Sequence, residues 1–80
     1  MLIELFEDYY INSDIIEEMQ IQEEEDAVAL FGKGNFVVII NCAHASNVMI
    51  KEISIAFSAY KEAREYTRRL AEKTKAYMVH

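Results

Sequence analysis

Apolar and polar residues alternate with a period of two in several stretches of the first 57 residues. In residues 15–22 one side holds Ile15, Met19 and Ile21 and the other holds Glu18, Gln20 and Gln22, with a lapse at Glu17. Such alternation is typical of a strand with one face in the core and one in water. We expect strands at 15–22 and at 48–57, the second presenting on one face Met49, Ile53, Ile55 and Phe57.

The N-terminal segment Leu2–Ile11 fits either a strand or a short helix. It is rich in leucine, isoleucine, phenylalanine and tyrosine. Its β-branched and aromatic residues favour the strand. The polar cluster Asn12–Asp14 that follows is typical of a turn.

Two apolar runs predict a β-hairpin. Ala27–Phe31 and Phe36–Asn41 are joined by Gly32–Asn35, whose two glycines can adopt the positive φ of a tight reversal. The segment Phe36–Ile40 is apolar at every position, which is typical of a central strand covered on both faces. A single helix covers one face of such a strand, so we expect a second subunit to cover the other.

A C-terminal helix is predicted over about residues 59–77. Ala59, Ala63, Tyr66, Leu70, Thr74 and Tyr77 recur at spacings of three and four, which places them on one face. Ser58 is expected to cap this helix, because its hydroxyl can accept a hydrogen bond from a free amide of the first turn.

These elements predict a single α+β domain over residues 1–80. Three to five antiparallel strands within residues 2–57 form a meander that packs against the C-terminal helix. The core of so short a chain is small, and one cysteine forms no internal disulfide, so we expect a homo-oligomer, with a dimer favoured. The expected core residues are Leu30, Phe36, Val38, Ile40, Ile53, Ile55, Phe57, Ala63, Tyr66 and Leu70.

The charge is unevenly distributed along the chain. Residues 1–57 hold eleven acids and two bases, a net charge of −9, whereas residues 58–80 hold three acids and six bases, a net charge of +3. The sum is the overall net charge of −6. An acidic body repels the phosphates of a duplex, so nucleic acid is not the expected main partner.

Four consecutive acids, Glu23, Glu24, Glu25 and Asp26, form the most concentrated charge in the chain. Their mutual repulsion predicts a turn in water that also protects strand edges from aggregation. The alternative is an acidic surface that docks on a basic partner, with Tyr9 and Tyr10 as candidate anchors, because tyrosine is enriched at binding hot spots. Packing in the core or at a dimer interface is the other interpretation of these tyrosines.

A basic face on the C-terminal helix is the basis of a second interpretation. Lys61, Arg64, Arg68 and Lys75 fall on one side of the predicted helix. Such a face could track phosphates in a nucleic-acid-binding regulator. Glutamates interleave with these bases, however, so a solvated amphipathic helix is the competing interpretation.

Cys42 and His44 are a weak candidate for catalysis. An imidazole can activate a thiol, but no oxyanion-hole signature accompanies the pair, and the single cysteine cannot complete a structural zinc site. The spacing of Gly32 and Gly34 does not match a phosphate-binding loop. We therefore expect a chain that is not an enzyme and has no cofactor and no metal.

The function expected is a small acidic protein-interaction module, self-associating, with inhibitor and adaptor as candidate roles. Size and charge are similar to those of small acidic phage-encoded inhibitors of host defence, a similarity of composition alone. The first residues lack the basic start of a signal peptide, and no apolar run approaches the roughly 18 residues of a membrane span. Cytoplasmic location is expected, with no membrane contact.

Overall fold

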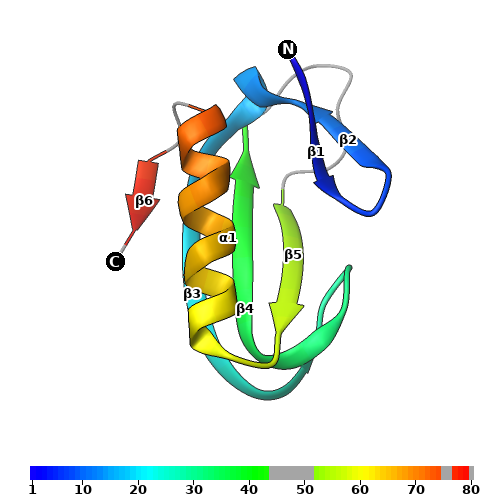
Figure 1. Ribbon diagram of the computed structural model, residues 1–80, viewed down its shortest axis with the longest axis vertical. Coiled ribbons are helices and arrows are strands. Elements are labelled where there is room, and N and C mark those ends of the chain that lie inside the picture. The colour runs from blue at the N-terminus through cyan, green and yellow to red at the C-terminus, as the bar shows by residue number, and fades with distance from the viewer. Residues whose placement is uncertain (44–51, 75–76, 80) are drawn as a thin grey trace.

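The α+β architecture is confirmed. The computed structural model describes residues 1–43, 52–74 and 77–79. In chain order the elements are β1 (Leu2–Phe6), β2 (Tyr9–Asn12), the 3-10 turn η1 (Ser13–Ile15), β3 (Ile16–Val28), β4 (Lys33–Cys42), β5 (Glu52–Phe57), α1 (Tyr60–Lys73) and β6 (Tyr77–Val79). Helix α1 lies across one face of the sheet formed by β3, β4 and β5 (Figure 1).

The strands form two sheets. The larger has the order β5-β4-β3-β6, with β6 parallel to β3 and the other pairs antiparallel, and the smaller is the β1-β2 hairpin. The prediction of Phe36–Ile40 as a central strand is confirmed, because β4 lies between β3 and β5. The predicted strand 48–57 is seen from Glu52 onward, and its earlier residues, Met49 included, lie outside the described part of the chain.

The main core lies between the sheet and α1. Val38, Ile40, Ile53, Ile55, Ala63 and Leu70 are buried there as predicted, and Phe36, Phe57 and Tyr66 pack against them half-buried. Leu30 was wrongly predicted in the core: its side chain is 58% exposed. The core also contains residues that were not predicted, namely Ile3, Leu5, Ile11, Ile16 and Met19.

The N-terminal segment is a hairpin of two strands, neither a helix nor one strand. Glu7 and Asp8 form the two-residue turn with φ values of 26° and 66°, the positive values that a tight hairpin reversal requires. The Asp8 amide donates a hydrogen bond of 2.9 Å to Glu4 Oε2. Asparagine and glycine usually supply such turns, so a Glu-Asp pair gives little sequence signal.

The β3-β4 hairpin differs from the prediction in length and turn position. Strand β3 continues through the four acids, which were expected in a turn, and the reversal lies at residues 29–32, three residues earlier than predicted. The pairing shifts between Glu23↔Phe36 and Ala27↔Gly34, so β3 bulges at the acids. The hairpin curls there, and Phe31 at its tip forms a parallel bridge with Ile55 of β5 (Figure 1).

This curl covers part of the outer face of the central strand, around Val37, from within the same chain. Val37 is 5% exposed and packs in a second cluster with Ala27 and Ala56, with Ala29 and Ile39 beside it. Ile39, on the same face, is only half-buried, so cover by a second subunit stays a prediction.

Helix α1 is shorter than predicted and begins without the expected cap. Its N-cap is Ala59, which makes no side-chain hydrogen bond, so the prediction of a Ser58 cap is wrong. Ser58 Oγ instead donates to Glu62 Oε1 over 3.2 Å. The helix ends at Lys73, and Tyr77 belongs to β6 rather than to the helix.

Candidate functional site

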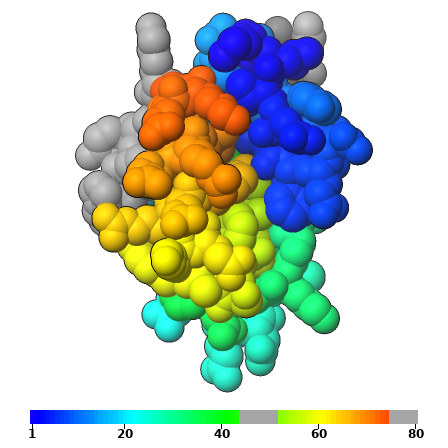
Figure 2. All heavy atoms as spheres, in the orientation of Figure 1, coloured from blue at the N-terminus to red at the C-terminus, as the bar shows by residue number. Residues whose placement is uncertain are grey.

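The acidic residues form a projecting surface, which we call the acidic bend: Glu23, Glu24, Glu25 and Asp26. All four are exposed, and they occupy the bulge where β3 curls toward β5. Asp26 has a φ of 51°, and its amide donates to Asn35 Oδ1 over 3.0 Å, which fixes the bulge to β4. The curled segment lies at the lower end of the molecule, where atoms of the hairpin stand out from the body (Figure 2).

Two apolar side chains follow the acidic bend and point outward. Val28 is 83% exposed and Leu30 is 58% exposed, whereas the intervening Ala29 packs on the second cluster. Val28 and Leu30 are therefore available to a partner. The sequence did not reveal this pair, because an apolar run gives no indication of which residues a curled hairpin turns outward.

The predicted tyrosine anchors do not join the acidic bend. Tyr9 is half-buried, and its ring centroid lies 5.0 Å from that of Phe31, so it packs the tip of the large hairpin against the small one. Tyr10 is exposed, but it lies in β2, apart from the bend (Figure 1). Of the predicted partner-binding residues, the structure brings together only the four acids.

Three predicted basic residues share one flank of α1, which we call the basic helix face: Lys61, Arg64 and Arg68. Their spacing of three and four residues places them side by side, and all are exposed. With Glu65 they line a shallow hollow of about 250 Å³. The fourth predicted base, Lys75, lies outside the described residues.

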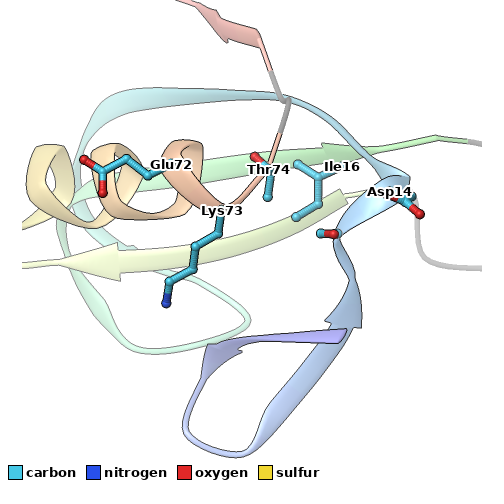
Figure 3. Close-up of a pocket in the computed structure, with 6 residues that line it drawn as sticks. Asp14, Ile16, Glu72, Lys73 and Thr74 are labelled. Atoms are coloured by element: carbon cyan, nitrogen blue, oxygen red, sulfur yellow. The ribbon is translucent and has the colours of Figure 1, made fainter. Parts of the chain in front are cut away.

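Another hollow lies beside the C-terminal end of α1 and has a volume of about 360 Å³. It is lined by Ser13, Asp14, Ile16, Glu72, Lys73 and Thr74. The carboxylates of Asp14 and Glu72 lie at opposite ends of this hollow, and Lys73 points away from both (Figure 3). Among the described residues that line this hollow, the charged groups do not converge as a catalytic or ion-binding site needs.

Cys42 lies in an environment that opposes thiolate formation. It is half-buried at the end of β4, and desolvation followed by the negative charge of Glu17 raises the pKa of its thiol. An activated cysteine needs the opposite shift, because the thiolate is the nucleophile. His44 lies outside the described residues, so its placement relative to Cys42 is not described.

Among the described residues, no three acidic, histidine or cysteine side chains are grouped as a metal site would need. Within the same residues, no helix has the length and apolar character required to cross a membrane. Comparison with known protein families, with curated proteins and with solved structures found no match to this chain.

Proposed function

We propose that this chain is a non-catalytic protein-interaction module that binds a basic partner through its curled hairpin. The observation that carries the proposal is the outward pair Val28 and Leu30, beside the four exposed acids of the acidic bend. Inhibitor and adaptor are the roles that suit such a module. The single cysteine is compatible with the reducing cytoplasm, where we place the protein.

Charge and apolar area contribute differently to such binding. The four acids attract a basic surface and speed its approach, an effect that salt weakens. The apolar pair supplies contact area that leaves water on binding, and its effect persists at high salt. A partner that matches both presents basic residues around an apolar recess.

The proposal is tested by NMR titration of the ¹⁵N-labelled chain with two probe peptides. One peptide is decalysine, and the other is a ten-residue peptide alternating lysine and leucine. We expect amide shifts centred on residues 23–33 with both probes. The alternating peptide should bind more tightly and lose less affinity as salt rises, because only it can use Val28 and Leu30.

Two variants with equal loss of charge make the test specific. The first carries Glu23→Gln, Glu24→Gln, Glu25→Gln and Asp26→Asn. The control carries Glu7→Gln, Asp8→Asn, Asp14→Asn and Glu52→Gln, four exposed acids elsewhere. The proposal is supported if only the first variant binds the peptides at least tenfold more weakly. Equal weakening in both variants would mean that the peptides respond to net charge and not to the acidic bend.

A second candidate function is nucleic-acid binding through the basic helix face, favoured by the exposed bases that line one hollow. Charge reversal at Arg64 and Arg68 should then abolish binding of a single-stranded RNA probe. An unchanged affinity for the RNA removes this candidate.

A further inference from the structure

We propose that the basic helix face is the docking site for the acidic bend of a second copy of this chain. The inference extends the proposed function, since it names one partner of the acidic bend. The two surfaces have opposite charge, since three bases with Glu65 among them line the helix face and four acids form the bend. A copy that offers its bend to one neighbour keeps its helix face free for another.

The two surfaces are on separate elements and do not neutralise each other within the chain. The acidic bend belongs to β3, whereas the basic helix face lies on the exposed flank of α1. Within the described part of the chain, no hydrogen bond or ion pair links a residue of the acidic bend to a residue of the basic helix face. Both surfaces are therefore open to another molecule.

A contact between two different surfaces is head-to-tail. Such contacts form a closed ring when the rotation between copies closes, and an open chain when it does not. A symmetric dimer would instead use one surface on both copies. The proposal thus differs from a simple dimer in requiring two separate patches for one interface.

The net charge of −6 sets how this association depends on salt. At about 0.01 M salt the screening length is roughly 30 Å, so whole copies repel each other. At about 0.15 M it is roughly 8 Å, which screens that repulsion while contacts between touching charges persist. At about 1 M it is roughly 3 Å, and the contacts weaken too. Association is therefore expected to be strongest at intermediate salt.

Three charge-reversed proteins test the pairing by sedimentation velocity. The bend variant carries Glu23→Lys, Glu24→Lys and Glu25→Lys, and the helix variant carries Lys61→Glu, Arg64→Glu and Arg68→Glu. The third protein carries all six changes and so keeps the original net charge. The substituted side chains are exposed, and circular dichroism verifies that each protein folds.

We expect each single-patch variant to self-associate at least tenfold more weakly than the original protein. The six-residue variant, and an equimolar mixture of the two single-patch variants, should recover association. A chain that stays monomeric at millimolar concentration at every salt overturns the inference, as does association that neither reversal changes.

These outcomes are separable from those of the proposed function. If the chain is monomeric but still binds the alternating lysine-leucine peptide at residues 23–33, only the inference of self-docking is rejected. If the chain self-associates through both patches but binds neither probe peptide, only the proposed binding of other basic partners is rejected.

Discussion

Two glycines permit the curl of the β3-β4 hairpin, on which the position of the acidic bend depends. Gly32 has a φ of 76°, and a Cβ there would lie 2.9 Å from the Ala56 carbonyl oxygen. A Cβ on Gly34 would overlap the Phe57 carbonyl oxygen. The sequence identified these glycines as turn residues, but only Gly32 is in the turn. Gly34 is needed because β4 passes close to the end of β5.

Gly34→Ala should destabilise the fold by about 1–3 kcal/mol, because backbone atoms must move to admit the methyl group. Urea unfolding measures this free energy. Lys33→Ala, at the exposed neighbouring position, is the control and should change it by less than about 0.5 kcal/mol. Equal stabilities of the two variants would mean that β4 does not approach β5 so closely.

Tyr66 joins the helix to the N-terminal hairpin. Its hydroxyl donates a 2.7 Å hydrogen bond to the Leu5 carbonyl oxygen, and its ring packs 5.3 Å from that of Phe57. Sequence periodicity placed Tyr66 on the buried face of the helix. It could not identify Leu5 as the partner, since the two residues are 61 positions apart.

Tyr66→Phe should reduce the free energy of unfolding by about 1 kcal/mol at pH 7, the usual net value of one hydrogen bond. Desolvation by burial raises the pKa of Tyr66 above that of the unfolded chain. Its stabilising contribution is therefore complete below about pH 10, the pKa of an unfolded tyrosine, and decreases as the pH rises above that value. Urea unfolding from pH 7 to 11 should show the two proteins converging above pH 10. A constant difference would contradict this assignment.

At the scale of elements, the start of α1 lacks a hydrogen bond from a capping side chain. Ala59 has the extended backbone typical of an N-cap, with φ −128° and ψ 143°, but it has no side chain able to accept a hydrogen bond. Glu62 is the third residue of the helix, the position that completes a capping box when serine or threonine stands at the cap. The predicted cap, Ser58, lies one residue before the observed N-cap.

Ala59→Ser should stabilise the protein by about 1 kcal/mol, because its hydroxyl can accept a hydrogen bond from an amide in the first turn. Thermal or urea unfolding measures the gain. The matched change Ser58→Ala should have a small effect, because it removes only an exposed contact to Glu62. A larger loss from Ser58→Ala than the gain from Ala59→Ser would restore Ser58 as the cap.

The strands show which parts of the fold local pattern can predict. β4 and β5 follow from continuous and alternating apolar residues, so both strands were predicted, although β4 begins three residues earlier than expected and only the second part of the predicted strand 48–57 is described. β3 was divided in the prediction, because four adjacent acids disfavour a strand. The structure accommodates them with a bulge and with the positive φ of Asp26, neither of which has a strong sequence signature.

At the scale of the whole molecule, the positions of the site residues depend on tertiary contacts that the sequence pattern does not indicate. The four acids were predicted to lie in water, with a partner surface as the alternative, and the structure keeps them exposed together. Tyr9 was predicted at that surface but packs against Phe31 instead. Leu30 was predicted in the core but is exposed, because the hairpin curls. Both differences come from one tertiary feature, the return of the hairpin tip to β5.

The central claim is that the curled hairpin binds a basic protein partner, and affinity capture from the native lysate with nuclease present tests it most directly. The original chain, the variant with the acidic bend neutralised, and the variant with four other acids neutralised serve as baits. Mass determination identifies what each bait retains. We predict a stoichiometric basic protein held by the original chain and the control but lost by the bend variant. Retention of that protein by all three baits would contradict the claim.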